Sequence, residues 1–347
     1  MKWGPLAFLV LSLLIKSHAL SNKNNRTETF KVFRVYPQSW QHIETLAEIR
    51  KISEEENEID FWLDSRQPGQ FADIMVAPRA QSYFMDLLMK HDLQFKTTID
   101  DVEKMIYENE HHIKNDDKPH VLDENYENLM HYENFRFRKR LKDEPSKFGD
   151  RPFEKVGQAR ANYPFGQYTD YATMVRYMRT IEFYYPHIAK LIRIGTSHEG
   201  QPIEGLKLGY HVSNTSKPGF WIDGNIHARE WASSHTALFI INQLVSGYGK
   251  DPVVTYYMNK MNFFIIPCLN PDGYEYSRSS AWPEIRLWRK NRSPERCAPS
   301  RWGGIRCCSG VDLNRNFDFH WSESGANHHP CSNEYVGESP FSEPESR

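Results

Sequence analysis

Residues 220–231 read FWIDGNIHAREW and join an apolar strand to a polar corner. Phe220 to Gly224 predicts a short buried strand, and Trp231 to Tyr248 predicts a mostly apolar helix. His227 and Glu230 stand between them, three residues apart. An imidazole nitrogen and a carboxylate oxygen are ligands that a catalytic zinc ion uses. A His-x-x-Glu spacing is also common at helix starts, where the acid favours the helix dipole, so this corner alone is a weak sign of a metal.

Apolar runs on both sides of the corner predict the fold class. We expect a long amphipathic helix over 169–192, kinked or ended by Pro186, and then a hairpin over 191–210. Met261 to Leu269 is a second, near-continuous apolar strand. Buried strands that alternate with helices predict an α/β fold, a mixed sheet with helices on both faces. Active sites in such sheets lie at the carboxyl ends of strands, which is where the corner falls.

Residues 30–108 form a separate compositional unit. Their apolar spacing predicts the strands 30–35, 59–63, 72–76 and 95–99, and helices around 43–52 and 83–93. The order strand, helix, strand, strand, helix, strand predicts a small ferredoxin-like α+β domain in front of the larger one. This unit contains no candidate catalytic cluster.

Residues 109–160 are highly charged and poor in branched aliphatic side chains. They include a basic run, Arg136, Arg138, Lys139 and Arg140. Such a run is either a solvated helix face or a protease-sensitive hinge. We favour a connecting segment that an activating protease cuts, so that residues 161–347 form the effector domain.

The first 19 residues predict a secretory signal peptide. Lys2 supplies the basic start, Leu6 to Ile15 the apolar centre, and Ser17 to Ala19 a cleavage site of small residues. The apolar centre is too short for a membrane span, and no second apolar run of spanning length follows. We therefore expect a secreted, extracellular protein.

The composition is that of an ordinary globular chain of about two domains. Of its 347 residues, 39% are hydrophobic and 25% are charged, and a net charge of -2 gives no basic field for nucleic acid. The five cysteines lie in the last quarter of the sequence, and an odd number allows at most two disulfides and one thiol.

Three further motifs follow the corner. They are Asn-Pro-Asp-Gly at 270–273, Leu-Trp-Arg-Lys at 287–290 and Val-Asp-Leu-Asn-Arg-Asn at 311–316. Together with His-Ala-Arg-Glu-Trp at 227–231, they give the chain its resemblance to the secreted zinc metallocarboxypeptidases of the pancreatic carboxypeptidase A type, the M14 family with an N-terminal activation domain. The resemblance covers nearly the whole chain after the signal, and the four motifs in this order are jointly very specific.

The resemblance implies roles for the residues around the metal. His227 and Glu230 would be two of three protein ligands of one Zn²⁺, and Asp312 would accept the other ring N–H of His227. Arg289 would stabilise the oxyanion that develops when water activated by zinc attacks the peptide carbonyl.

The resemblance also implies the substrate, the C-terminus of a peptide or protein. Asn314 and Arg315 would grip the free carboxylate, which would make the protein an exopeptidase. Arg229 and Arg286 would lie along the same groove.

The cysteines are organised by the same resemblance. Cys308 and Cys331 fall where the family has a disulfide, and Cys297 and Cys307 bracket an insertion and would pair with each other. Cys268, inside an apolar strand, would be the odd buried thiol.

In this family the third zinc ligand, a histidine, and the general-base glutamate come from the later half of the catalytic domain. The surroundings of His320, His328 and His329 do not match that third-ligand segment. We expect this chain to be the first part of a zymogen and inactive by itself, because two ligands hold zinc poorly and no base is present. The alternative is a secreted, inactive decoy or inhibitor that acts through its activation domain. The C-terminal residue preference is not legible in the sequence.

Overall fold

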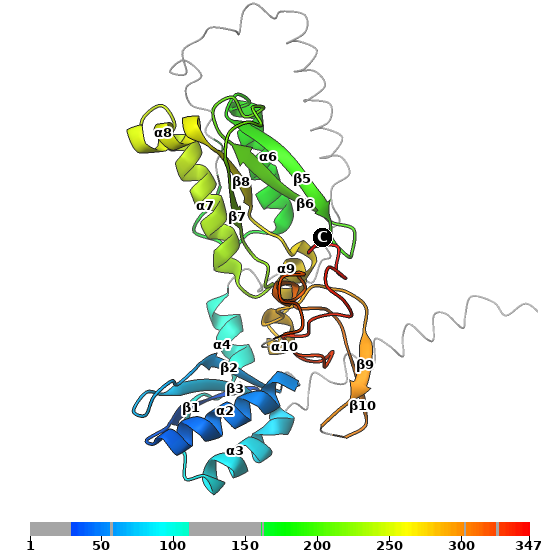
Figure 1. Ribbon diagram of the computed structural model, residues 1–347. Coiled ribbons are helices and arrows are strands. Elements are labelled where there is room, and N and C mark those ends of the chain that lie inside the picture. The colour runs from blue at the N-terminus through cyan, green and yellow to red at the C-terminus, as the bar shows by residue number, and fades with distance from the viewer. Residues whose placement is uncertain (1–28, 56–57, 111–160, 162, 302, 324–325) are drawn as a thin grey trace, which may run out of the picture.

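The computed structural model describes residues 29–55, 58–110, 161, 163–301, 303–323 and 326–347. They form two parts, which we name the leader (residues 29–110) and the body (residues 161–347), shown in Figure 1. The predicted signal peptide and the basic run 136–140 lie outside the described residues. None of the helices in the described part of the chain has the length and apolar character needed to cross a membrane.

The leader is a four-stranded antiparallel sheet with two helices on one face. Its elements are β1 (Lys31–Tyr36), α2 (Trp40–Glu55), β2 (Ile59–Leu63), β3 (Ala72–Val76), the short 3-10 helix η1 (Pro78–Ala80), α3 (Gln81–Lys90), β4 (Gln94–Ile99) and α4 (Val102–Asn109). The sheet order β2-β3-β1-β4 confirms the predicted ferredoxin-like arrangement. Strand alternation sends Phe33 and Val35 into the core beneath α2 and α3.

Helix α4 was not among the predicted elements. It is short, and it begins where the side chain of Asp101 accepts a hydrogen bond from the backbone N–H of Lys104. This N-cap was its local signal, but an eight-residue charged segment has too little periodicity to predict a helix.

The body has a four-stranded mixed sheet. Its first elements are α6 (Tyr171–Tyr184), β5 (Ala189–Thr196), β6 (Pro202–Leu208), β7 (Gly219–Asp223), α7 (Trp231–Gly247), α8 (Pro252–Lys260) and β8 (Asn262–Ile266). The sheet order is β5-β6-β8-β7, with β7 parallel to β8 and the other pairs antiparallel. Helices α6 and α7 pack against one face, on Leu206 and Leu208. The predicted class, a mixed sheet with helices preceded by a ferredoxin-like domain, is confirmed. Helices were expected on both faces of the sheet, whereas α6 and α7 share one face.

Two predicted elements differ in detail. The helix expected over 169–192 ends at Tyr184, because the residue before Pro186 is disfavoured in helical conformation and the chain turns into β5. The strand 220–224 was expected to be buried. It forms β7 at the edge of the sheet instead, and its Phe220 and Trp221 are 52% and 50% exposed. Apolar composition does not distinguish an edge strand from a central one.

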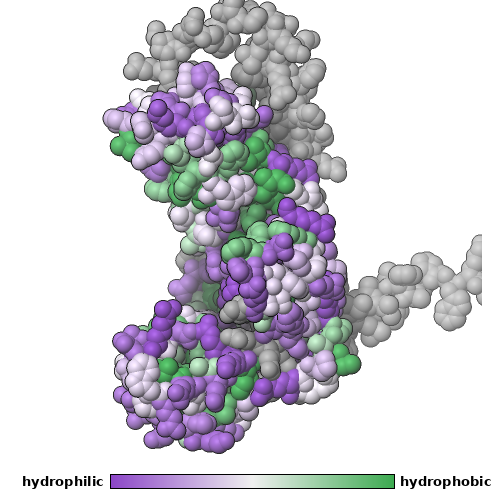
Figure 2. Space-filling model, in the orientation of Figure 1, coloured by the Kyte–Doolittle hydropathy of each residue, from purple (hydrophilic) through white to green (hydrophobic). Residues whose placement is uncertain are grey.

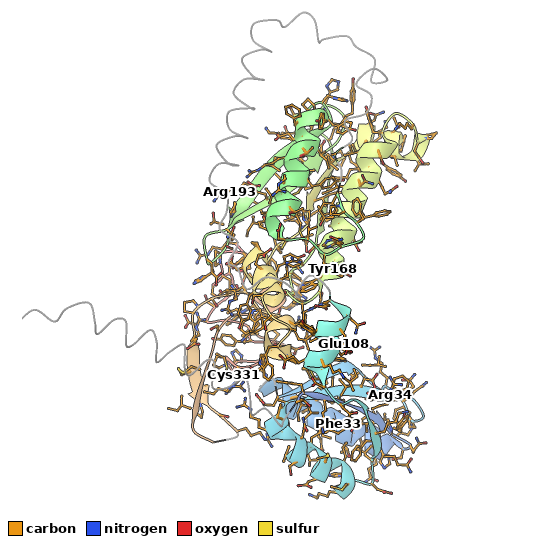
Figure 3. All side chains as sticks on the ribbon, turned by 180° about the vertical axis from the view of Figure 1, so that it is seen from behind. Phe33, Arg34, Glu108, Tyr168, Arg193 and Cys331 are labelled. Atoms are coloured by element: carbon orange, nitrogen blue, oxygen red, sulfur yellow. A yellow bond between two sulfur atoms is a disulfide. The ribbon has the colours of Figure 1, made fainter. Side chains whose placement is uncertain are left out.

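The rest of the body carries the loops that follow β8. It contains α9 (Pro271–Arg278), α10 (Pro283–Arg286), β9 (Arg296–Pro299), β10 (Ile305–Cys308) and the 3-10 helix η5 (Leu313–Arg315). Strands β9 and β10 form an antiparallel ribbon that is closed by a disulfide between Cys297 and Cys307. A second disulfide joins Cys308 to Cys331, which lies beside the ribbon in Figure 3. Cys268 is buried and unbridged.

The leader docks on the body through the sheet face opposite α2 and α3. Val32 and Met75 on that face pack with residues of α4 and with Ala281 and Trp282 of the body. The rings of Phe30 and Trp282 meet edge to face, with their centroids 5.3 Å apart. The outer surface of the leader is mainly hydrophilic in Figure 2. One sheet therefore uses both faces, one for its own core and one for the body.

Candidate metal and carboxylate site

The corner between β7 and α7 is held by its backbone. A Cβ at Gly224 would lie 2.8 Å from the carbonyl oxygens of Pro267 and Ser233, so only glycine fits there. Asn225 adopts a left-handed conformation, φ 55°. Its Nδ2 donates to the carbonyl oxygens of His227 and Glu230 at 3.2 and 3.3 Å. This fixed loop presents the side chains of His227 and Glu230 on the same side.

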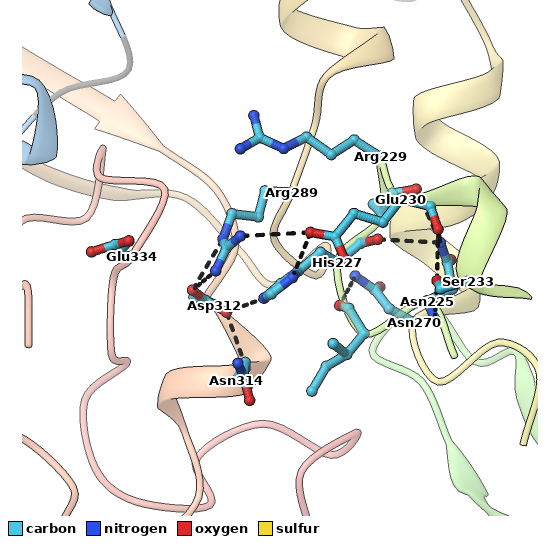
Figure 4. A network of polar contacts seen from close by, with 12 residues as sticks. Asn225, His227, Arg229, Glu230, Ser233, Asn270, Arg289, Asp312, Asn314 and Glu334 are labelled. Atoms are coloured by element: carbon cyan, nitrogen blue, oxygen red, sulfur yellow. Dashed lines mark hydrogen bonds and ion pairs between the residues drawn. The ribbon is translucent and has the colours of Figure 1, made fainter. Parts of the chain in front are cut away.

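His227 makes contacts through both ring nitrogens (Figure 4). Nδ1 lies 3.0 Å from Oε1 of Glu230, and Nε2 lies 3.2 Å from Oδ1 of Asp312. An ionised carboxylate only accepts, so Nε2 carries a proton towards the fully buried Asp312. Burial lowers the pKa of His227, but its hydrogen bonds to Asp312 and Glu230 outweigh burial and raise it. The hydrogen bond from His227 lowers the pKa of Glu230.

Arg289 shares the same buried carboxylate. Its Nη2 and Nε donate to Oδ2 of Asp312 at 2.8 and 3.1 Å, and its Nη1 lies 3.9 Å from Oε1 of Glu230. Burial raises the pKa of Asp312, but His227 and Arg289 together hold it below its usual value. Asp312 thus stays ionised and fixes the orientation of both an imidazole and a guanidinium.

The donor set at this corner fits two ligands of a zinc ion. With Nε2 of His227 committed to Asp312, Nδ1 faces Glu230, and nitrogen plus carboxylate oxygen is a common zinc pair. A carboxylate on the other ring nitrogen is the usual support of a ligating histidine. Across the described residues, no group of three or more His, Cys, Asp or Glu side chains is placed to hold a metal.

The segment with the predicted carboxylate-binding residues leads out of the same network. The backbone N–H of Asn314 donates to Oδ1 of Asp312 at 3.0 Å, which starts η5. Arg315 directs Nη2 towards Oε1 of Glu334 at 3.8 Å and keeps a third of its side chain exposed. The structure therefore brings Asn314 next to the His227 network, and Arg315 follows it on the same short helix.

Arg229 and Arg286 both face acidic residues of the leader. Nη1 of Arg229 donates to Asp60 at 2.8 Å, and Nε of Arg286 donates to both oxygens of Glu110 at 2.8 and 2.7 Å. Arg229 and Arg289 line one cavity with Asp60 and Glu334, of about 230 Å³. The leader thus forms one wall of the cavity that Arg289 lines.

Sequence reasoning did not find Asp60, Glu110 or Glu334. Their partners are distant in the sequence, so no local spacing marks them. The only local signal is at Asp60, a charge within an otherwise apolar strand.

The three later histidines are engaged elsewhere. Nδ1 of His320 contacts Glu323 at 2.7 Å, and Nε2 of His328 contacts the Ser322 hydroxyl at 3.0 Å. Nδ1 of His329 accepts from the N–H of Cys331, so its Nε2 donates to the carbonyl oxygen of Pro299. His329 therefore ties the loop of the second disulfide to β9.

Comparisons with known proteins point to one family. A family model described as zinc carboxypeptidase matches residues 174–347, and one described as carboxypeptidase activation peptide matches residues 33–109. Carboxypeptidase A2 of Mus musculus is 30% identical over 92% of this chain, which spans 64% of that protein's length.

Two further matches widen the comparison. A fungal protein named inactive metallocarboxypeptidase ecm14, from Talaromyces stipitatus, is also 30% identical, over 91% of this chain and 47% of its own length. The crystal structure of carboxypeptidase A from Helicoverpa armigera superposes with a TM-score of 0.65, at 23% identity, over 93% of this chain and 66% of that one. The last match supports the fold alone.

Proposed function

Because the chain belongs to the zinc carboxypeptidase family, we propose that it is the leader-bearing part of a secreted zymogen that removes C-terminal residues from peptides and proteins. One observation carries the proposal. The buried carboxylate of Asp312 holds His227, Arg289 and the start of the Asn314 segment together. A metal-facing imidazole, a guanidinium and a carboxylate-binding segment are what hydrolysis next to a free C-terminus needs.

The side chains divide the work as follows. Arg315 and Asn314 would bind the substrate's terminal carboxylate, the guanidinium as a two-pronged donor. Arg289 would donate to the scissile carbonyl oxygen and stabilise the negative charge that develops there. Its ion pair with Asp312 keeps the guanidinium in place before substrate arrives.

His227 and Glu230 would hold the zinc ion. When bound, zinc supplies Lewis-acid chemistry to the peptide carbonyl and to a water molecule. Asp312 accepts the proton on Nε2 of His227. Nδ1, which here shares a proton with Glu230, would give up that proton and offer its lone pair to the metal.

The leader would keep the body in a zymogen state. It pairs Asp60 and Glu110 with Arg229 and Arg286, and it covers the cavity beside Arg289. Proteolysis within 109–160 would cut the covalent link between the leader and the body.

Zinc titration of the 347-residue chain, in competition with a chromophoric chelator, tests the metal assignment. We expect His227→Ala and Glu230→Ala each to weaken zinc binding by at least about tenfold. His320→Ala, which removes an exposed histidine paired to Glu323, is the matched control and should bind as the unchanged chain does. Equal zinc affinity of His227→Ala and the unchanged chain would contradict the assignment.

The second candidate function is an inactive, secreted decoy or inhibitor that acts through the leader. Two observations support it: a relative, the fungal ecm14 protein, is named inactive, and the corner offers two candidate zinc ligands, His227 and Glu230. Sequencing the transcript past the codon for Arg347 separates the candidates. An open frame that encodes a further histidine and glutamate supports the zymogen, and an immediate stop codon supports the inactive protein.

A further inference from the structure

The disulfide-closed ribbon, residues 296–308, carries an arginine into the leader. Nη1 of Arg306 on β10 lies 2.6 Å from Oε1 of Glu58, immediately before β2. Glu58 is only 2% exposed, and Arg79 of the leader donates to the same carboxylate. The carboxylate of Glu58 is thus fully desolvated between two guanidiniums.

The ribbon is a rigid support for Arg306. Cys297 and Cys307 close it, and Cys308 ties it to Cys331. At its base, Nε of Arg296 donates to Glu338 at 2.8 Å. A guanidinium held on such a frame loses little side-chain freedom when it binds a carboxylate.

Arg306 and Arg229 open into the same hollow. A cavity of about 360 Å³ is lined by both arginines, by Asp60 of the leader and by Arg292. Each of three body arginines, Arg229, Arg286 and Arg306, meets a leader carboxylate, namely Asp60, Glu110 and Glu58. The surface of the leader that meets the body is therefore acidic at three positions where the body is basic.

We propose that Arg306 is a carboxylate-binding subsite of the body, which Glu58 occupies in the uncleaved chain and an acidic side chain of a bound peptide occupies once the leader has left. The inference rests on the proposed function for the direction of the peptide. With its C-terminus at Arg315 and its scissile bond at Arg289, the upstream residues pass Arg229 and continue towards Arg306. The ribbon thereby selects substrates with Asp or Glu upstream of the cleaved bond.

The test uses the full chain with Glu58→Gln, Asp60→Asn and Glu110→Gln combined, which removes the three leader carboxylates. The probes are two fluorescent peptides, acetylated and C-terminally amidated, that differ only in one upstream Glu or Gln. Fluorescence anisotropy should give about tenfold tighter binding of the Glu peptide, the scale of one charge-assisted hydrogen-bonded pair. Adding Arg306→Gln should abolish that preference, whereas Arg301→Gln, on the turn of the same ribbon, should keep it.

A second measurement uses the unchanged chain, in case the triple variant does not fold. The Glu peptide should compete with Glu58 and speed hydrogen exchange in residues 58–61 and 305–308, and the Gln peptide should not. Equal binding of the two peptides, a Glu preference that survives Arg306→Gln, or unchanged exchange overturns the subsite.

The amidated probes keep this test apart from the proposed function. A free-acid peptide should bind the triple variant better than its amide, and Arg315→Gln should remove that difference while leaving the Glu preference. Loss of the free-acid effect alone therefore counts against the carboxypeptidase proposal, and loss of the Glu preference alone counts against Arg306.

Discussion

At the scale of single residues, the candidate site is organised by one buried carboxylate. Asp312 accepts from His227, Arg289 and the backbone of Asn314, and it is fully buried. Without this carboxylate, His227 and Arg289 would each need another hydrogen-bond partner. A change at Asp312 should therefore alter the orientation of His227 as well as that of Arg289.

We predict that Asp312→Asn weakens zinc binding of the chain by about 10- to 100-fold, because the amide no longer fixes the protonated Nε2 of His227. Chelator competition measures the affinity. Asp318→Asn, an exposed acid in the next loop, is the control and should leave zinc binding unchanged. Wild-type affinity in Asp312→Asn would mean that His227 is not oriented through this carboxylate.

A second residue-scale prediction concerns pH. Lys290 is 2% exposed, its Nζ donates to the carbonyl oxygen of Pro330 at 2.7 Å, and burial lowers its pKa to about 7. Lysine in an unfolded chain has a pKa near 10.4, so between pH 7 and 10 the unfolded state binds the extra proton. The contribution of Lys290 to the free energy of unfolding therefore rises with pH in this window, by up to about 1.4 kcal/mol per unit, and is flat below pH 7.

Urea unfolding of Lys290→Met at several pH values checks this slope. The free energy of unfolding of the unchanged chain should rise relative to that of Lys290→Met as pH rises from 7 to 10. Lys250→Met, at an exposed position, should run parallel to the unchanged chain. Parallel curves for Lys290→Met would show that Lys290 titrates normally.

Local motifs marked the residues of the site but not their partners. His227 and Glu230 are three residues apart and lie within one motif, so the sequence shows them together. Arg229 and Asp60 are 169 residues apart, and only the docking of the leader on the body brings them together. Ion pairs that depend on tertiary structure leave no periodic trace in a sequence.

At the scale of elements, β6 has no room for a side chain at Gly205. It lies between β5 and β8, and a Cβ at Gly205 would meet the carbonyl oxygen of Ile265 at 2.4 Å. Gly205→Ala must push two paired strands apart. We predict a loss of about 1–3 kcal/mol in the free energy of unfolding.

Denaturant unfolding of Gly205→Ala measures this loss. Gly166→Ala is the control, because a Cβ there meets nothing within 4 Å. Equal stability of the two variants would mean that β6 and β8 are less closely apposed than described.

The sequence predicted which segments are helices or strands better than it predicted where they end or how exposed they are. Alternation in β1 and the helical spacing after it identified the leader fold, because each strand has one face in a core. The end of α6 depended on Pro186 and on where β5 finds its partner. The exposure of β7 depended on neighbours in space, which composition does not encode.

At the scale of the whole molecule, the leader and the body are joined by ion pairs around an apolar centre. Three carboxylates of the leader face three arginines of the body, and Phe30 of the leader packs on Trp282 of the body. The pairs are partly buried, so salt screens them less than surface pairs.

We predict that limited trypsin cuts within 136–140 and that the leader then stays bound to the body. Size-exclusion chromatography at physiological salt should elute the two pieces together. The chain with Glu58→Gln, Asp60→Asn and Glu110→Gln should release its leader under the same conditions, because three partly buried arginines lose their charged partners. Survival of the intact chain in trypsin would contradict a processing site, and co-elution of the triple variant would show that apolar contact alone holds the leader.

The sequence predicted part of the domain architecture. The order of strands and helices predicted a ferredoxin-like leader in front of a mixed-sheet body, and the fold agrees. The second use of the leader sheet, as the surface that meets Ala281 and Trp282, was not legible. Apolar residues on both faces of a strand indicate burial without saying by what.

The neighbouring cysteines of β10 have a consequence for how the body matures. Consecutive strand residues point to opposite faces, so the register that sets Cys307 across from Cys297 turns Cys308 towards Cys331. A slip of one residue would exchange the partners of the two thiols. The disulfide pairing therefore depends on the strand register. Exchange of the disulfides by an oxidoreductase should stop at the isomer that joins Cys297 to Cys307 and Cys308 to Cys331, because that isomer is the one compatible with the paired strands.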